Sequence, residues 1–342
     1  MIEEKEKFEL GIKDWDYYAD SVINADLFIG NGFSINLCKR LSYISLFENF
    51  SNQCNPKLVQ LFEKLKTSNF ETVLKALNNA EIIAKIFNLN YEELIPTILE
   101  LKKGLIKTIS ETHPEYKEIN PEIFRSLAVE FAHFNDIYTT NYDIFLYKII
   151  LASNELVERG LLNAKIYQDE FCVELGEHRL GLGEAYDDSR VIYYLHGALF
   201  LYNEGQTYKF RKGGETDEYI RMLRNEIEND NIPLFVAEGS FEDKLNTIND
   251  NYYLRRCLEI LKRKNKDNIV VYGSSFQSSD NHIINCIVES KPKNLIVSIY
   301  LGNKDKAEIE QEISRTNGLF SNISVSYYDS KTLFNFSPQY VF

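Results

Sequence analysis

Two side chains stand out as candidates for chemistry because each directly follows an apolar run that predicts a buried strand. His196 follows the run 191–195, and Asn141 follows the run 136–140. Histidine changes charge near neutral pH and can accept a proton, whereas an asparagine amide can orient a bound group through one acceptor and two donors. The same residues also fit structural roles, with His196 satisfied within the fold and Asn141 in an Asx turn.

Two glycine-containing turns follow other predicted strands. The first is Gly30-Asn-Gly32-Phe-Ser34, and the second is Gly273-Ser-Ser-Phe276, which is followed by Asp280 and His282. Small residues at a strand end allow a phosphate or a ribose to approach the backbone closely. Each segment is also compatible with an ordinary turn, with Ser34 capping the next helix in the first case.

The wider pattern alternates short apolar strands with amphipathic helices. This alternation predicts an α/β fold, a Rossmann-like and mostly parallel sheet with helices on both faces. In such a sheet, ligands bind beyond the carboxyl ends of the strands, where the four polar clusters should meet. Strands are expected at 24–30, 136–140, 191–195, 233–237, 268–272, 294–300 and 323–328, and helices at 121–134, 143–153 and 252–262.

A change of periodicity after Pro56 predicts a helical insertion subdomain at 56–114. The segments 18–55 and 115–342 would then form the Rossmann-like domain. We take a structural cap as the primary interpretation of the insertion, with a lid or an assembly surface as alternatives. Within the larger domain, 199–202 and 207–211 flank Glu204-Gly205 and predict a β-hairpin.

Composition narrows the class of protein. The 342 residues include 38 basic and 51 acidic side chains, a net charge of −13 that argues against direct nucleic-acid binding. No apolar run reaches the roughly 20 residues of a membrane span, and the charged N-terminus does not resemble a signal peptide. The five cysteines form no CxxC pair, so neither a zinc ribbon nor a disulfide framework is predicted. We expect a cytoplasmic protein without a metal.

Taken together, the four clusters resemble one known family. Their order along the chain and their residue types resemble the motifs of the sirtuin-like NAD-consuming domains of bacterial antiphage defence. The most specific part is Thr139-Thr-Asn-Tyr-Asp143 followed by Leu195-His-Gly197. The resemblance covers 25–303 and implies a Rossmann-like fold that binds NAD+ as a substrate.

The resemblance also implies roles for individual residues. Asn141 and His196 would be catalytic. Gly30, Gly32 and Ser34 would surround the pyrophosphate, Gly273 and Ser274 the adenosine ribose, and Asp143 the nicotinamide side. The complete set of expected NAD-binding residues is Gly30, Asn31, Gly32, Ser34, Thr140, Asp143, Gly273, Ser274, Ser275, Asp280, His282 and Asn303.

Two departures from deacylating sirtuins favour hydrolysis of NAD+ over protein deacylation. The four-cysteine zinc module is absent, and the segment after the first glycine turn is Leu41-Ser-Tyr-Ile-Ser-Leu-Phe rather than Ile-Pro-x-Phe-Arg. We therefore expect an NAD+ glycohydrolase. The alternatives are a module that senses NAD or ADP-ribose without turnover and, less favoured, an NAD-dependent deacylase.

An unregulated NAD+ hydrolase would harm its own cell, so activity must be controlled. The resemblance implies antiphage defence by NAD+ depletion, a homo-oligomer and a possible partner ATPase. The sequence itself identifies neither the trigger nor the partner.

Overall fold

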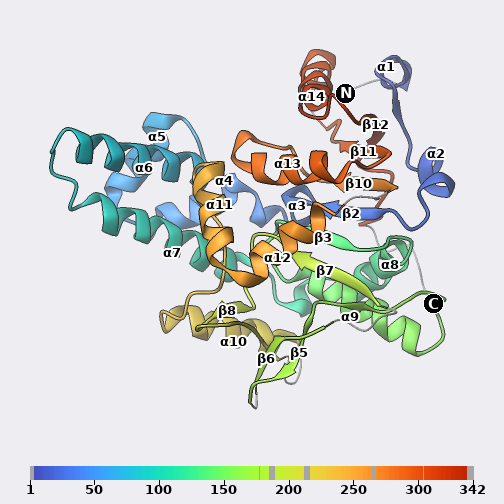
Figure 1. The fold of residues 1–342 in the computed structure, drawn as a ribbon, viewed down its shortest axis with the longest axis horizontal. Helices are drawn as coiled ribbons and strands as arrows, with labels where there is room; N and C mark the ends of the chain where they lie inside the picture. Colours follow the sequence, from blue (N-terminus) through green and yellow to red (C-terminus); the bar gives the residue numbers. More distant parts are fainter. Residues whose placement is uncertain are drawn as a thin grey trace.

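A parallel sheet of eight strands forms the centre of the molecule (Figure 1). The computed structural model describes residues 4–176, 178–184, 189–211, 216–263, 267–302 and 304–336. In spatial order the strands are β1 (Ile12–Lys13), β12 (Ser324–Asp329), β11 (Asn294–Ile299), β10 (Asn268–Tyr272), β2 (Asp26–Ile29), β3 (Ile137–Thr139), β7 (Arg190–Tyr194) and β4 (Tyr167–Gln168). Every neighbouring pair of these described strands is parallel.

The strand order confirms the predicted Rossmann-like fold. Starting from β2, the chain adds β3 and β7 on one side, then returns to add β10, β11 and β12 on the other. This is the 3-2-1-4-5-6 order of doubly wound dinucleotide-binding sheets. The order reverses between β2 and β10, so the crevice for a ligand is expected beyond the carboxyl ends of these two strands.

Helices cover both faces of the sheet. Helices α8 and α9 contact each other, as do α12 and α13, and right-handed crossovers place the two pairs on opposite faces. The other helices outside the insertion lie around these four (Figure 1). The bounds of all helices outside the insertion are α1 (Glu4–Glu9), α2 (Asp16–Ala19), η1 (Asp20–Val22), α3 (Asn31–Leu37), η2 (Lys39–Leu41), α4 (Tyr43–Ser51), η3 (Tyr116–Glu118), α8 (Pro121–Phe131), α9 (Phe145–Glu158), α10 (Thr216–Glu228), α11 (Phe241–Asp250), α12 (Tyr252–Leu261), η4 (Ser278–Asp280), α13 (Asn281–Ser290) and α14 (Lys306–Leu319).

The segment predicted as a helical insertion holds three helices that extend away from the sheet (Figure 1). They are α5 (Pro56–Leu65), α6 (Phe70–Ile86) and α7 (Leu94–Thr112). The Asn55 and Asn69 side chains accept from backbone N–H groups in the first turns of α5 and α6, which fixes where these helices begin. Phe50, Phe62 and Phe70 pack edge to face and join the helices at their base.

A second sheet is antiparallel and contains the predicted hairpin. Its order is β5 (Phe171–Glu174), β6 (Arg179–Leu182), β9 (Thr207–Phe210) and β8 (Leu201–Asn203), and pairing of Asn203 with Thr207 confirms the β8–β9 hairpin. The sequence analysis did not predict β5 and β6. The predicted strand at 233–237 is wrong, because only Phe235 forms an isolated bridge, to Gly197.

Among the residues that the structure describes, we find no helix whose length and hydropathy would let it cross a membrane.

Candidate functional site

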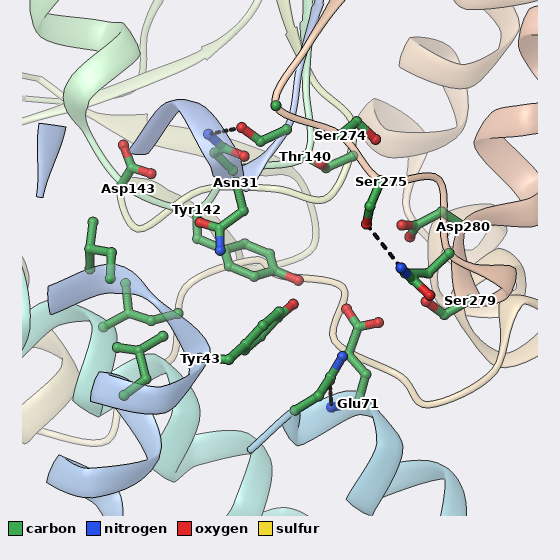
Figure 2. Close-up of a pocket in the computed structure, with 18 of the residues that line it drawn as sticks. Asn31, Tyr43, Glu71, Thr140, Tyr142, Asp143, Ser274, Ser275, Ser279 and Asp280 are labelled. Carbon is green, nitrogen blue, oxygen red and sulfur yellow. Dashed lines mark hydrogen bonds between the residues drawn. The ribbon is translucent and has the colours of Figure 1, made fainter. Parts of the chain in front are cut away.

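A cleft opens at the carboxyl ends of β2, β3 and β10, at the point where the strand order reverses (Figure 2). Its empty volume is about 950 Å³, which includes the open solvent at its mouth. Strand-end loops form one wall and helices α4, α6 and α7 the other. The lining residues are Gly30, Asn31, Leu41, Tyr43, Leu46, Asn69, Glu71, Leu105, Ile109, Thr140, Asn141, Tyr142, Asp143, Gly273, Ser274, Ser275, Gln277, Ser279 and Asp280.

The two glycine turns hold each other in place. Gly32 donates its N–H to the Gly273 carbonyl at 2.9 Å. A Cβ added at Gly30 would lie 2.7 Å from that carbonyl oxygen, and Gly273 has a φ of +68°. The glycines are therefore required for contact between the β2 and β10 loops. Gly30 and Gly273 also line the cleft, whereas Gly32 is not among its lining residues.

An arginine from α14 fixes the second loop. The Arg315 guanidinium donates to the carbonyl oxygens of Ser275 at 2.6 Å and Phe276 at 2.8 Å. Phe276 adopts a φ of +45°, which is uncommon for a residue with a side chain. These bonds hold the loop so that Ser274 and Ser275 line the cleft.

Asn141 is fixed at the floor of the cleft and is 7% exposed. Its Nδ2 donates both protons, to the Gly30 carbonyl at 3.1 Å and to the Ser34 hydroxyl at 2.8 Å. Its Oδ1 is buried without a hydrogen-bond partner among the described residues. An unsatisfied buried acceptor is costly in an empty protein, and this one belongs to a residue that lines the cleft. The arrangement fits a ligand that supplies a hydrogen-bond donor.

Asp143 continues this buried network. It accepts the Ser34 hydroxyl proton on Oδ2 and the Phe145 N–H on Oδ1, the latter at 2.9 Å. The second bond supports the start of α9, because Phe145 is its first residue. Burial raises the pKa of Asp143, and the donors from Ser34 and Phe145 oppose that shift.

His196 and His282 form a buried imidazole pair. Their Nε2 atoms lie 2.8 Å apart and their rings stack at 24°, so one nitrogen donates a hydrogen bond to the other. Burial lowers the pKa of His196, and the positive charge of Lys244 adds to that shift. The pKa of His282 is lowered to about 3 for the same two reasons. The expectation that His196 titrates near neutrality is therefore wrong, because both rings are neutral at physiological pH.

Gly197 is required by the close packing of the backbone after β7. Its φ is +79°, and an added Cβ would lie 2.0 Å from the Leu234 carbonyl oxygen. A residue with a side chain could not make this contact with the backbone at 234–235.

Asn141 and His196 lie at corresponding positions on neighbouring strands. Thr139 of β3 pairs with Tyr194 of β7, and each functional residue follows two positions later. Both residues therefore lie at the same edge of the sheet. His196 is 3% exposed and is not among the residues that line the cleft, whereas Asn141 is.

A buried ion triad crosses the far end of the cleft. The Lys244 ammonium of α11 donates to Glu71 of α6 at 2.9 Å and to Asp280 of η4 at 3.0 Å. Burial alone would lower the pKa of Lys244, but the two carboxylates raise it above its usual value. Burial raises the pKa of Glu71, and the Lys244 ammonium opposes that shift. The triad thus links the helical insertion to the Rossmann-like domain.

Two tyrosines lie beside the triad, Tyr43 on the helical wall and Tyr142 on the strand-end wall. In Figure 2 the Tyr43 and Tyr142 side chains lie between Asn31 and Glu71. The Tyr142 hydroxyl donates to the Val236 carbonyl at 2.5 Å. Burial and the negative charge of Glu71 raise the pKa of both hydroxyls, so they remain neutral donors.

His196, His282 and Asp280 also place three possible metal ligands within 4.8 Å of one another. The two imidazole nitrogens are hydrogen-bonded to each other, and Asp280 already pairs with the Lys244 ammonium. A divalent cation here would lie close to a buried positive charge, which disfavours binding. We therefore assign no metal to this cluster.

The structure brings most of the predicted site residues together. Those that line the cleft are Gly30, Asn31, Thr140, Asn141, Asp143, Gly273, Ser274, Ser275 and Asp280. Those that lie behind it are Gly32, Ser34, His196 and His282. Asn303 lies outside the described residues.

Four residues at the site were not expected from the sequence. They are Tyr43, Glu71, Tyr142 and Lys244. Tyr142 lies within the motif Thr139-Thr-Asn-Tyr-Asp143, so its position directly after a predicted strand was a signal that it could line the site. The other three lie in helical segments where an isolated tyrosine, glutamate or lysine carries no local signal.

Comparison with known proteins gives a family but no activity. No curated protein matches the chain. A family model described as a domain of unknown function, DUF4917, matches residues 27–334, nearly the whole sequence. The protein therefore belongs to the DUF4917 family.

Proposed function

We propose that this protein is an NAD+ glycohydrolase, which cleaves the bond between nicotinamide and ribose. The proposal rests on the hydrogen bonding of Asn141. Its Nδ2 donates two hydrogen bonds that fix the amide, whereas its buried Oδ1 accepts none from the described residues. A ribose hydroxyl or an attacking water could supply a donor.

The position and lining of the cleft support a dinucleotide. It lies at the reversal point of a doubly wound sheet, where such ligands bind. Within the described ranges its lining includes no Lys or Arg, so neutral donors such as Asn31, Ser274 and Gln277 would hold the pyrophosphate. Glu71 and Asp280 could accept from ribose hydroxyls and would repel a 2′-phosphate, which favours NAD+ over NADP+.

The reaction needs little covalent participation by the protein. The glycosidic carbon–nitrogen bond breaks, its electron pair leaves with neutral nicotinamide, and the ribose becomes oxocarbenium-like. Water then adds to the anomeric carbon and releases one proton, giving ADP-ribose. A fixed amide oxygen stabilises the transition state because it needs no reorientation during the reaction.

The imidazole pair is the candidate acceptor for the released proton. A neutral imidazole is the form that accepts a proton, and burial keeps both rings neutral at physiological pH while making them weaker bases. His282 fixes the Nε2 side of His196 at 2.8 Å and thereby orients the ring. Because His196 lies behind the cleft lining, ligand binding must bring the ring and the water together, directly or through a second water.

The biological setting belongs to the same proposal. The resemblance to sirtuin-like defence domains supports NAD+ depletion during phage infection, in the cytoplasm and under the control of a homo-oligomer or a partner ATPase. Burial of His196 is compatible with an enzyme whose catalytic arrangement forms only when the ligand binds.

The decisive experiment follows nicotinamide and ADP-ribose after purified protein is mixed with NAD+, NADP+, or NAD+ with an acylated peptide. We expect release from NAD+ alone. His196→Ala should lower the rate by about 10²–10⁴-fold, the usual contribution of general acid–base catalysis, while NAD+ binding persists. In the wild type, the rate should show no loss attributable to His196 protonation as the pH falls through the range in which an ordinary histidine titrates, because the pKa of His196 is lowered.

Each other outcome has a distinct meaning. Release that requires the acylated peptide would identify a deacylase, and calorimetric binding of NAD+ without release would identify a sensor. Unchanged release by a folded His196→Ala variant would contradict the role given to this residue. No binding and no release would reject the proposed function.

A further inference from the structure

The distal end of the α6–α7 hairpin carries a concentration of exposed apolar side chains. It holds seven of the seventeen large hydrophobic residues that are exposed in the described part of the chain. Each of the seven is more than half exposed. They form what we call the hairpin tip: Ile82, Ile83, Ile86, Phe87, Leu89, Ile95 and Leu99.

These side chains are not a continuation of the hairpin's own core. Val73, Leu77 and Ala84 of α6 are buried. At 100° per residue, Ile82, Ile83 and Ile86 lie on the opposite side of the helix. The helix is therefore apolar on two sides near its end, and only one of them is covered by the chain itself.

The base of the hairpin is firmly attached to the body, unlike its tip. A Cβ added at Gly239 would lie 2.1 Å from the Lys75 backbone nitrogen, so this loop is in tight contact with α6. Lys102 of α7 pairs with Glu238 at 2.9 Å. The tip begins about 10 Å further along α6, at 1.5 Å per residue from Lys75 to Ile82.

The size of the tip suits a protein interface. The seven apolar side chains, each more than half exposed, together have an accessible area on the order of 700 Å². This is close to the roughly 800 Å² that each partner contributes to a standard interface. Isolated exposed hydrophobic residues are common on monomers, but a gathered patch of this size marks a contact surface.

The charge of the tip identifies the kind of partner. Between 76 and 99 the charged side chains are Glu81, Lys85, Glu92 and Glu93; Glu81 pairs with Lys85 at 2.7 Å, and Glu93 pairs with Lys57 at 2.6 Å. The chain as a whole carries −13, so two copies repel each other over most of their surface, and these two pairs reduce that repulsion at the tip. Membrane-binding helices are instead rich in Lys and Arg.

We propose that the hairpin tip is the contact surface between two copies of this chain, related by a twofold axis. A twofold contact uses the same patch on both copies and must therefore be self-complementary. An apolar patch of low net charge, with Asn79, Asn88 and Asn90 around it, meets that condition. This inference does not depend on the proposed NAD+ hydrolysis.

Sedimentation velocity of the full chain over a concentration series tests the proposal. The wild type should form a dimer. Ile83→Lys with Ile86→Lys places two like charges on each side of the contact and should weaken dimerisation by about 100-fold or more. Both sites are exposed and near the C-terminal end of α6, where cations are favourable, so the fold should persist. Ile95→Lys with Leu99→Lys provides an independent pair on α7.

The matched control is Ile23→Lys with Leu161→Lys, which changes two equally exposed residues elsewhere and should leave the dimer intact. A charge-swap experiment adds specificity. Ile83→Glu with Ile86→Glu should also be monomeric alone, and mixing it with the Lys pair should restore a dimer.

Three results would overturn the proposal. One is a wild type that stays monomeric up to its solubility limit, including one that instead floats with phosphatidylcholine–phosphatidylserine vesicles. Another is a dimer that folded tip variants do not weaken. The third is a Lys and Glu mixture that remains monomeric.

Discussion

The two walls of the cleft are built in different ways. The strand-end wall presents backbone and short side chains that hydrogen bonds hold in place, with Asn141, Ser34 and Asp143 as one buried network. The helical wall presents longer side chains, and its charged member Glu71 is held by the Lys244 ammonium. The buried network of the strand-end wall is thus held by neutral hydrogen-bond donors, whereas Glu71 on the helical wall is held by an ion pair.

The surroundings of two carboxyl groups, one on each wall, illustrate this difference. Burial raises the pKa of both Asp143 and Glu71. The burial of the Asp143 carboxylate is compensated by neutral hydrogen-bond donors on its own wall, from Ser34 and Phe145. Glu71 is compensated by a cation from another helix, so its environment depends on how the insertion lies against the body. We infer that the rigid wall carries the chemistry and the helical wall carries selectivity and control.

The largest effect is expected on the strand-end wall. Asn141→Ala removes the fixed acceptor and should lower kcat for nicotinamide release by about 10³-fold, as for loss of one preorganised polar group. Asn154→Ala is the matched control, because Asn154 makes two comparable hydrogen bonds to Tyr167 outside the cleft. Steady-state kinetics on folded proteins should separate the two variants. Equal kcat values for both variants would contradict the division between the walls.

The next effect is on the stability of the helical wall. Lys244→Met leaves the carboxylates of Glu71 and Asp280 without their cation and should lower the free energy of unfolding by about 3 kcal/mol. Ser34→Ala on the other wall removes only hydroxyl hydrogen bonds and should cost about 1–2 kcal/mol. Urea denaturation measures both. A smaller loss for Lys244→Met than for Ser34→Ala would reverse the comparison.

The strand-end wall was largely predictable from the sequence. Gly30, Asn141 and Gly273 each directly follow an apolar run, and parallel strands bring their carboxyl ends to one edge. Local sequence therefore specified their neighbourhood. It did not specify that Gly32 and Gly273 would contact each other, or that His196 would lie behind the cleft, because both depend on how loops pack.

The helical wall could not be predicted in the same way. Periodicity located the helices of the insertion, but it does not say which other element a polar helical residue meets. Glu71 and Lys244 are 173 positions apart, and their contact depends on how α6 lies against α11. The predicted strand at 233–237 failed for a related reason, since its apolar residues pack without a continuous strand partner.

A smaller effect should appear in the pH dependence of stability. The pKa of Glu71 is raised in the folded state, so that state holds the proton more tightly and loses stability as pH rises through the raised value. Glu71→Gln removes this titration, so the stability of the wild type relative to the variant should decrease with rising pH. Urea denaturation from pH 4 to pH 8 measures the slope. A difference that grows with pH would show that Lys244 dominates and lowers the pKa of Glu71.

The smallest effect should distinguish two neighbouring tyrosines on the two sides of the cleft. Tyr142 follows β3 and donates to the Val236 carbonyl at 2.5 Å, so Tyr142→Phe should cost about 1 kcal/mol of unfolding free energy. Tyr43→Phe, on α4, keeps the ring in place and should cost less, because the Tyr43 hydroxyl faces the cleft beside Glu71 (Figure 2). The Tyr43 hydroxyl should instead affect ligand binding, visible as a raised KM with unchanged kcat. Equal stability losses with no change in KM would place both tyrosines in the structural framework, and the helical wall would then contribute to selectivity only through its carboxylates.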